Sequence, residues 1–391
     1  MGLHDKTIMM IGGGIQEISA VKFAQECGFN VLVTDRSPTA PCFDYADFTA
    51  TIDGRDIEAL AAYAIMNKDN LNIKGVFTLT ELVTSVAAVA EAAALPGVSI
   101  AGAVACQNKD LSKKIWIEKG IPTPQGNVVK TFDEAKSLFE KYNRQIFVKP
   151  MVGFGGQNSR KIDSEKVLAD VFVGNEHDMV LEELIVGSMH DVNGLISEDG
   201  KFHPMGIVDR FFLDQFPVET GISTPSWLDQ NLQNKLYKLL ENAVKALGIT
   251  WGPVKGDAVL KNGEFKILEV APRLHGPKNS IYLLPFSGFN CLSACLGTIC
   301  GDTNTVIDRV IQERHCICKA ILPPVGSKFD EAGARNAILE KGVKEVLIFK
   351  SDNDNITQYQ NATDVPAYVF ATGQNSKECN DAIKSLDLFT V

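Results

Sequence analysis

Two carboxylates, Asp257 and Glu269, lie on neighbouring β-rich runs of the sequence that a short turn joins. The turn contains Asn262-Gly263, and Asn-Gly between two such runs is a strong signal for a β-hairpin. A hairpin would bring the two carboxylates close together, where they repel each other unless a cation lies between them. Hard oxygen ligands of this kind suit Mg²⁺ that holds a phosphate, and Arg273 could reach the same anion with its planar guanidinium. The alternative is a surface hairpin with solvated charges, since surface carboxylates are common.

Lysines and glycines earlier in the chain fit the binding of phosphate. Residues 108–120 predict a helix that ends at a glycine, with Lys109 and Lys113 on one face, where like charges are unfavourable unless they share an anion. Lys149 ends a predicted strand, and the glycine-rich residues 153–156 form a loop whose backbone N–H groups could approach phosphate closely. It is not a P-loop, because no Gly-Lys-Ser/Thr follows to open a helix. The alternatives are a solvated helix face and a flexible hairpin tip.

Residues 179–187 predict a strand followed by a turn. Free backbone groups at the end of this strand could meet the edge of an adenine, while a carboxylate meets the ribose.

The N-terminal residues have the pattern of a dinucleotide-binding unit. A buried-strand run at residues 7–11 is followed by the turn Gly12-Gly-Gly14, a helical segment, and a second strand that ends at Asp35. The full fingerprint needs glycine at the first, third and sixth positions, but Glu17 stands at the sixth. NAD binding is therefore an alternative, and a Rossmann-like half that has kept only the tight turn is the favoured interpretation.

The elements that must position these residues follow from the hydrophobic pattern. Strands and helices alternate to about residue 105, which predicts a parallel α/β unit. A long helix is expected at residues 228–247, just before the hairpin. The tail predicts a small α+β unit, with strands around residues 317–320, 345–349 and 367–371 and helices around residues 330–340 and 376–386.

Composition restricts the class of protein further. The 391 residues are enough for two or three domains, and 45% hydrophobic with 22% charged residues is typical of globular proteins. A net charge of −10 argues against general binding of nucleic acid or anionic membranes, although it allows a local basic pocket for a nucleotide. We expect the nine scattered cysteines to be reduced and buried in a cytoplasmic protein. The sequence shows neither a secretion signal nor an apolar run long enough for a membrane helix.

Taken together and in this order, these pieces resemble the ATP-grasp superfamily across nearly the whole chain. The resemblance is to the branch with carbamoyl-phosphate synthetase-type and biotin carboxylase-type domains, the carboxyaminoimidazole ribonucleotide synthetases and the carboxylate–amine (amino-acid) ligases. The motifs that carry it are Gly12-Gly-Gly14 with Ala40-Pro41 and Ala46-Asp47, Lys109-Asp-Leu-Ser-Lys113 with Gly120-Ile-Pro-Thr-Pro124, Val148-Lys149-Pro150 with Gly155-Gly156, Glu182-Glu183-Leu-Ile185, and Asp257 with Glu269 and Arg273.

The resemblance implies an α/β protein with an ATP-grasp fold, an N-terminal Rossmann-like pre-grasp domain and a small α+β C-terminal domain. The expected boundaries are residues 1–105, 106–308 and 309–391, with a lid subdomain at about residues 125–190. The implied cofactors are ATP and Mg²⁺, with Mn²⁺ as a second candidate. Carried over by position, the nucleotide contacts are Lys109, Lys149, Gly155, Gly156, Glu182, Glu183 and Ile185, the metal ligands are Asp257 and Glu269, and the arginine that stabilises an acyl phosphate is Arg273.

Four further residues should face the pocket of the second substrate: Arg210, Glu219, His275 and Gly276. Arg210, which we group with Arg273 as catalytic, could hold a substrate carboxylate, and Glu219 could hold a substrate amine. A purely structural role is equally open for each of them.

Three positions depart from the family pattern. Ala271 stands where an asparagine usually completes the metal site, so one Mg²⁺ would be held more weakly. Met189 stands where a glutamate usually binds the ribose, with His190 and Asp191 beside it as substitutes. Asn158 replaces the last glycine of the lid loop and still tolerates a left-handed backbone.

The implied reaction has two steps, in which a carboxylate attacks the γ-phosphate of ATP and an amine then displaces phosphate from the acyl phosphate. The loop at residues 153–159 would close to keep water from the intermediate. One alternative is a carboxyphosphate-forming enzyme that uses bicarbonate, and others are a non-catalytic ATP sensor and the NAD enzyme. Family analogy favours a homodimer.

Overall fold

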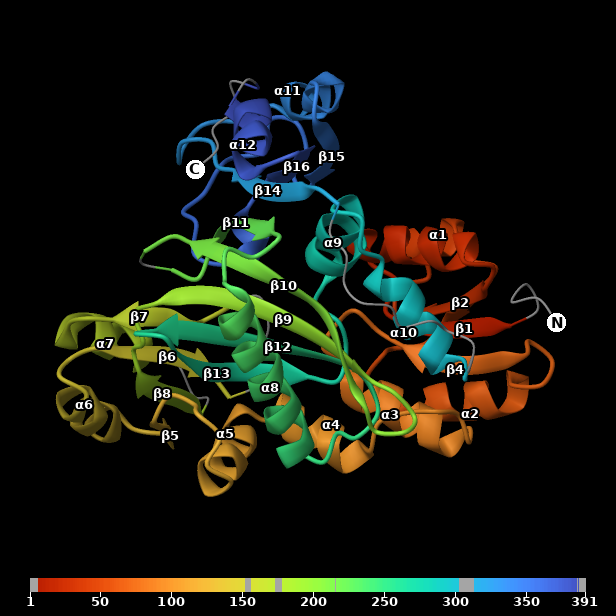
Figure 1. Cartoon of the computed structure of the whole chain (residues 1–391), viewed down its shortest axis with the longest axis horizontal. Coiled ribbons are helices and arrows are strands. Elements are labelled where there is room, and N and C mark those ends of the chain that lie inside the picture. Colours follow the sequence, from red (N-terminus) through yellow and green to blue (C-terminus); the bar gives the residue numbers. More distant parts are fainter. Residues whose placement is uncertain are drawn as a thin grey trace.

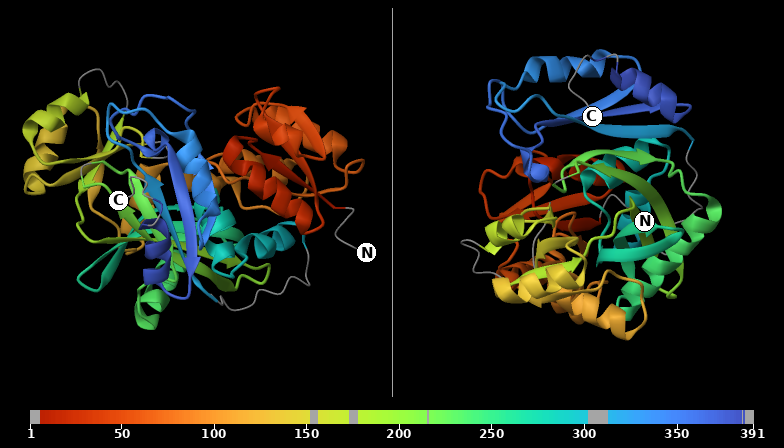
Figure 2. Two further views of the ribbon diagram at one scale, coloured as in Figure 1. Left: turned by 90° about the horizontal axis from the view of Figure 1, so that it is seen from above. Right: turned by 90° about the vertical axis from the view of Figure 1, so that its left-hand side faces the viewer.

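The computed structural model describes residues 6–151, 156–172, 178–214, 216–301, 313–384 and 386. The strands in these ranges form one sheet of eight strands and two sheets of four. The two smaller sheets lie at opposite ends of the large one (Figures 1 and 2), with the N-terminal sheet in red and the sheet of residues 126–183 in yellow.

The N-terminal sheet is parallel and confirms the predicted Rossmann-like pattern. Its strands are β1 (Thr7–Ile11), β2 (Asn30–Asp35), β3 (Phe48–Thr51) and β4 (Ile73–Phe77), in the order β3-β2-β1-β4. All of β1 is buried, which explains its unbroken apolar run, because a parallel strand is covered on both faces. The helices of this region are α1 (Ile18–Glu26), α2 (Ile57–Asn67), α3 (Val83–Ala92) and α4 (Ile100–Gln107). The sequence had not predicted the short edge strand β3.

The second four-stranded sheet is antiparallel, in the order β5-β8-β6-β7. It consists of β5 (Gly126–Val129), β6 (Ile146–Pro150), β7 (Arg160–Ile162) and β8 (Met179–Glu183), of which β6 and β8 were predicted. Helices α6 (Phe132–Lys141) and α7 (Glu165–Phe172) share its hydrophobic core, which includes Phe139, Leu168 and Ile146. Helix α5 (Lys109–Glu118), capped by the side chain of Asn108, precedes this sheet as predicted.

The eight-stranded sheet runs in the order β13-β12-β9-β10-β11-β14-β16-β15 and is antiparallel throughout. Its first half contains β9 (Ser188–Ile196), β10 (Phe202–Phe212), β11 (Glu219–Thr224), β12 (Gly252–Lys261) and β13 (Glu264–Ala271). The predicted hairpin is confirmed, since Asp257 pairs with Glu269 and the turn residues Asn262 and Gly263 have φ angles of 53° and 79°. Helix α8 (Gln230–Ala246) buries Leu236 and Leu240 in the hydrophobic core on this half of the sheet.

The tail extends this same sheet. Strands β14 (His315–Ile321), β15 (Val343–Ile348) and β16 (Ala367–Gly373) were predicted, as were helices α11 (Glu331–Asn336) and α12 (Ser376–Lys384). The sequence had not predicted that β14 pairs with β11, from Gly221 opposite Lys319 to Thr224 opposite Cys316. The C-terminal strands are therefore joined to the central strands by a continuous hydrogen-bond ladder.

A helical segment links the hairpin to the N-terminal sheet. The π-helix η4 (Lys278–Leu283) follows the hairpin and leads through α9 (Leu284–Phe286) to α10 (Cys291–Ile299). Ile299 packs so closely on β4 that a Cβ at Gly75 would lie 2.3 Å from its Cγ2. This contact fixes the end of α10 against the N-terminal sheet.

Eight of the nine cysteines are buried and one is half-buried, and the structure shows all nine as thiols and not as disulfides, as the sequence indicated. None of the helices in the described ranges is both long enough and apolar enough to cross a lipid bilayer.

Candidate active site

The hairpin carboxylates share a buried cation that the sequence analysis missed. Lys255 Nζ lies 3.2 Å from Asp257 Oδ1 and 2.8 Å from Glu269 Oε1. Only 4% of the Lys255 side chain is exposed, against 21% for Asp257 and 27% for Glu269. A signal was present, because Lys255 and Asp257 are two positions apart on one strand and so project from the same face. Lys255 therefore reduces the repulsion between Asp257 and Glu269. Each of these carboxylates is still partly exposed to solvent.

The charges in this group support one another. Burial opposes ionisation of Glu269, but Lys255 and Lys109 hold its pKa down at about 2. Burial likewise disfavours charge on Lys255, yet Asp257 and Glu269 raise its pKa above the ordinary value. Lys109 Nζ, which was predicted to hold phosphate, lies 3.6 Å from Glu269 Oε2. The structure thus places Lys109, which was predicted to bind phosphate, beside a carboxylate that was predicted to bind the metal.

Asp191 and His275 join Asp257 from the other side. His275 Nε2 lies 2.9 Å from Asp257 Oδ1 and 3.3 Å from Asp191 Oδ1, while His275 Nδ1 lies 2.9 Å from Asn193 Oδ1. Asp191 and Asp257 face each other across β9 and β12. These three side chains place one ligand atom each within 4.8 Å of one another, so Asp191 and His275 could complete a metal site with Asp257. The two carboxylates suit Mg²⁺ or Mn²⁺.

Arg210 and Glu219, predicted to hold substrate groups, bind each other. Arg210 Nε donates to Glu219 Oε2 at 2.8 Å, and its Nη1 lies 3.0 Å from Asp191 Oδ1 and 3.3 Å from Asp257 Oδ2. The other oxygen of Glu219 pairs with Lys278, whose Nζ lies 3.8 Å from the ring centroid of Tyr368 on β16. This network connects the hairpin to the C-terminal strands. A Cβ at Gly276, before the π-helix, would meet open space.

A second cluster of charges lies where α5 meets the four-stranded antiparallel sheet β5-β8-β6-β7, which we call the lid sheet. Glu182 receives Lys149 Nζ on one oxygen and Lys113 Nζ on the other, each at 2.8 Å, and all three side chains are buried. Burial opposes ionisation of Glu182, but the two lysines lower its pKa. Burial also lowers the pKa of Lys113, against the effect of Glu182. The geometry therefore disfavours the predicted contact between the Glu182 carboxylate and adenine, because both of its oxygens hold lysines.

The end of β8 remains compatible with the other two predicted adenine contacts, Glu183 and the backbone of Ile185. Glu183 pairs with Lys266 on β13 and accepts the N–H of Gln125 at 3.0 Å. The backbone of Ile185 makes no hydrogen bond within the described ranges.

The glycine-rich loop is described only in part. Gly156 has a φ of +72°, and a Cβ there would lie 2.8 Å from Pro217. Gly155 lies outside the residues that the structure describes.

His190 is poorly placed for the predicted contact with ribose. Its side chain is fully buried, its Nδ1 lies 2.8 Å from Asp209 Oδ1, and its Nε2 lies 2.9 Å from Ser188 Oγ. Its ring centroid is 5.3 Å from that of Trp227. With both nitrogens occupied, this histidine has a structural position in the core of the sheet.

The glycine turn after β1 is filled by acidic side chains. The N–H of Gly13 donates to Asp35 Oδ2 at 2.9 Å, and Glu17 Oε2 lies 2.7 Å from the place of a Cβ on Gly14. Burial raises the pKa of Glu17. An acid at the end of the second strand is compatible with a dinucleotide, but Glu17 at the phosphate-binding end of the turn disfavours one there.

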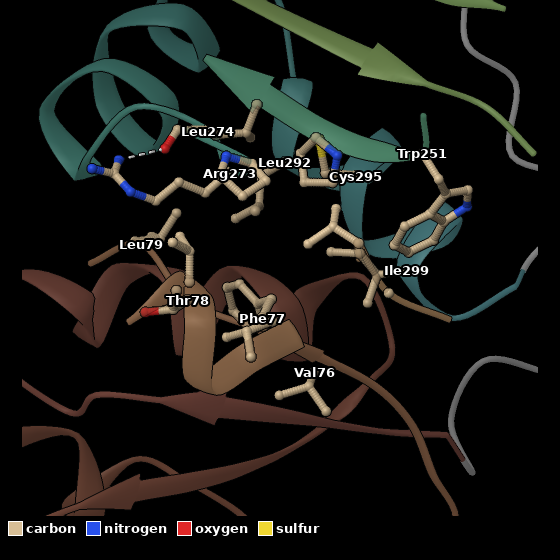
Figure 3. Close-up of a pocket in the computed structure, with 16 residues that line it drawn as sticks. Val76, Phe77, Thr78, Leu79, Trp251, Arg273, Leu274, Leu292, Cys295 and Ile299 are labelled. Carbon is tan, nitrogen blue, oxygen red and sulfur yellow. Dashed lines mark hydrogen bonds between the residues drawn. The ribbon is translucent and has the colours of Figure 1, made fainter. Parts of the chain in front are cut away.

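Arg273 reaches across to the N-terminal domain rather than to the hairpin carboxylates. Its Nη1 donates to the carbonyl of Leu274 at 2.9 Å, and its Nη2 pairs with Glu81 Oε1. Figure 3 shows it at one end of a small cavity of about 40 Å³, with Trp251 at the other end. Apolar side chains from both domains line this cavity, including Val76, Phe77, Leu79, Leu274, Leu292 and Ile299.

The fold is shared with solved ligases and synthases. The L-amino acid ligase from Bacillus licheniformis is similar over 99% of both chains, with a TM-score of 0.84 and 22% identity. The carboxyaminoimidazole ribonucleotide synthase from Aspergillus clavatus, solved with ATP, is similar over 98% of both chains, with a TM-score of 0.79 and 16% identity. The chain therefore has the fold of these two enzymes over nearly its whole length, in agreement with the predicted fold.

The sequence comparison then identifies the domain. Residues 106–277 match the family profile of the ATP-grasp domain, so this part of the chain is an ATP-grasp domain. A curated relative, the large chain of carbamoyl phosphate synthase from Methanothrix thermoacetophila, is 25% identical over 177 residues. This match covers 43% of the present chain and only 16% of that relative.

Proposed function

We propose that this protein is an ATP-dependent ligase that activates a small carboxylate as an acyl phosphate and joins it to an amine, releasing ADP and phosphate. The observation that carries the proposal is the convergence of Lys109, Lys255 and Arg210 on the partly open carboxylates Asp257 and Glu269. Phosphoryl transfer needs mainly positioning and neutralisation of charge, which such a group supplies without a covalent residue.

The residues present fit a divalent cation. Asp257 and Glu269 are ionised, partly exposed and already share one cation, Lys255, and Asp191 with His275 could add ligands where Ala271 supplies none. Bound Mg²⁺ or Mn²⁺ would neutralise the phosphate oxygens during transfer.

The nucleotide would lie between the lid sheet and the hairpin. We assign phosphate contacts to Lys109 and Lys149, and the adenine contact to the backbone of Ile185, with Glu183 nearby. Glu182 holds Lys149 and Lys113 in place, so we assign it a positioning role in place of adenine contact. Residues 153–155 of the loop predicted to close over the intermediate lie outside the residues that the structure describes.

The second substrate would lie beside Arg210, Arg273 and His275. In the first step, a carboxylate oxygen attacks the γ-phosphorus and ADP leaves. In the second step, the amine nitrogen attacks the acyl carbon, the bond to phosphate oxygen breaks, and phosphate leaves. Arg273 would stabilise the acyl phosphate after its release from Glu81.

The direct test is release of ADP and phosphate from ATP and Mg²⁺ with panels of amino acids, small carboxylic acids and bicarbonate. Release that depends on one carboxylate and rises with one amine would identify both substrates. Tight binding of ATP with no release on any panel would contradict the proposal and favour a sensor.

A bicarbonate-using enzyme is the second candidate. It is favoured by the similarity to carboxyaminoimidazole ribonucleotide synthase and to part of carbamoyl phosphate synthase. Release of ADP with bicarbonate alone would select it. We also propose a homodimer, which analytical ultracentrifugation of the purified chain would test.

A further inference from the structure

A charged pair joins the N-terminal domain to the central sheet. Glu81 follows β4 at its carboxyl end, the edge at which parallel α/β sheets bind ligands. Arg273 follows β13, and the two residues are 192 positions apart in the sequence. The Arg273 side chain is 9% exposed, whereas that of Glu81 is 38% exposed. One side of the Glu81 carboxylate is therefore open while Arg273 covers the other.

The pair lies within the electrostatic reach of the hairpin cluster. Among the influences on the pKa of Lys255, burial is the largest, and Arg273 and Glu81 act on it in opposite directions. Lys255 itself contacts Asp257 and Glu269. The strand register agrees, because Ala271, two residues before Arg273, pairs with Lys255 across β12 and β13. The pair of Glu81 and Arg273 therefore lies at the end of the hairpin that carries Lys255 and Glu269.

A side chain of α4 holds the backbone of Glu81 by a hydrogen bond. Gln107, the last residue of that helix, donates its side-chain N–H to the carbonyl of Glu81, and Thr84 Oγ1 lies 2.6 Å from Gln107 Oε1. Helix α5, with Lys109 and Lys113, begins two residues after Gln107. The position of Glu81 is consequently tied to the helix that carries a proposed phosphate lysine.

The guanidinium of Arg273 has capacity for another partner. Its Nε is buried and makes no hydrogen bond to any described residue. An acyl phosphate next to Arg273 would supply acceptor oxygens of higher charge density than one carboxylate. Engagement of Arg273 by this phosphate would leave Glu81 without its cation just as the intermediate forms.

The second step of a carboxylate–amine ligase needs a proton acceptor. An amine is mostly an ammonium ion near neutral pH, and its nitrogen has no lone pair until a proton leaves. The carboxylates of Asp191, Asp257, Glu219 and Glu269 each contact a lysine or arginine of the central sheet or of the π-helix beside it. Glu81 differs because its cation is the residue proposed to move to the intermediate.

We infer that Glu81 binds the ammonium group of the second substrate and accepts its proton in the second step. The inference rests on the proposed ligase function. One proton passes from the ammonium nitrogen to the Glu81 carboxylate, and the freed electron pair forms the C–N bond. Phosphate leaves with the electrons of the broken C–O bond and takes the second proton that the nitrogen loses as the amide forms. Glu81 afterwards returns the proton to solvent and pairs again with Arg273.

Hydroxylamine separates this role from a structural one. It is largely neutral near pH 7, so it captures an acyl phosphate as a hydroxamate without a base. In Glu81→Gln we expect carboxylate-dependent ADP release and hydroxamate formation to stay within about threefold of the unchanged protein, while amide formation falls about a hundredfold, the usual size of general-base catalysis. Glu91→Gln, an exposed position on α3, is the matched control and should change neither reaction.

Two results would overturn the inference. Equal losses of hydroxamate and amide in a folded Glu81→Gln protein would mean that the pair with Arg273 only holds the domains together. Unchanged amide formation would mean that another group takes the proton. If the unchanged protein forms no hydroxamate with any carboxylate, the ligase function itself fails, and this outcome is distinct from both.

Discussion

The two lysine–carboxylate clusters differ in which partner is open to solvent. At the lid sheet, Glu182 is buried and holds two buried lysines, Lys113 and Lys149. At the hairpin, the lysine is buried and the two carboxylates are partly exposed. The first cluster has its carboxylate sealed between two cations, whereas the second presents carboxylate oxygens outward.

This difference predicts that one cluster contributes mainly to stability and the other mainly to catalysis. Removing one partner of a sealed ion pair leaves an uncompensated buried charge, so we expect Glu182 to matter mainly for stability. The open oxygens at the hairpin can accept a cation and a phosphate, so we expect Glu269 to matter mainly for turnover. Substitutions at the two sites should therefore have effects of different kinds.

Glu269→Gln should have the largest effect on activity. Loss of one metal carboxylate should lower ATP turnover by about a thousandfold, because metal ions contribute several kcal/mol to such reactions. Release of ADP at saturating ATP measures this effect. Glu264→Gln in the same hairpin is the control, since its carboxylate is 82% exposed. Unchanged turnover in Glu269→Gln would contradict the proposal that Glu269 is a metal ligand.

Glu182→Gln should have the largest effect on stability. Two buried lysines would lose the carboxylate that they share, at a cost of about 3 kcal/mol in the free energy of unfolding. Urea denaturation measures the change, and the exposed Glu118→Gln on α5 serves as control. A loss no greater than that of Glu269→Gln would contradict the distinction between the two clusters.

The pH dependence of stability sharpens the same comparison. The lysines hold the pKa of the buried Glu182 below its ordinary value of 4.5, against the effect of burial. A carboxylate with a lowered pKa stabilises the fold above the ordinary value, and this stabilisation is lost as the pH falls below it. The urea midpoint of the unchanged protein should therefore fall more steeply below pH 4.5 than that of Glu182→Gln. Parallel curves would contradict this account.

Lys255→Met should have the smallest effect, and it tests whether Lys255 occupies the place of a metal cation. Without this lysine, Asp257 and Glu269 lack their shared cation, so Mg²⁺ should stabilise the variant by about 1 kcal/mol more than the unchanged protein. Thermal unfolding with and without Mg²⁺ measures the difference. Lys261→Met, at the exposed end of the same strand, is the control. Equal stabilisation of both proteins by Mg²⁺ would show that Lys255 does not compete with the metal.

The sequence predicted features that depend on neighbouring residues. The hairpin followed from Asn262-Gly263, and the strands β1 and β6 followed from short apolar runs with clear ends. These signals are local, so no knowledge of the sheet order was needed. Resemblance to a family supplied the roles assigned to the residues of the motifs.

Partners from distant strands could not be predicted in the same way. Asp191 meets Asp257 only because β9 lies beside β12, and Arg210 joins them from β10. Glu182 was assigned to adenine because nothing in its own strand shows that two lysines from elsewhere would enclose it. His190 was placed at the ribose for the same reason, although the strand pairing buries it beside Trp227.

The pairing of β14 with β11 affects what happens when the chain is shortened. A protein that ends before β14 would expose the outer edge of β11, with backbone N–H and C=O groups that now bond to residues 316–319. Unpaired edges of this kind recruit strands from other molecules. We therefore expect the C-terminal region to protect the eight-stranded sheet from self-association, and a truncated chain to aggregate even where the proposed nucleotide-binding residues are all retained.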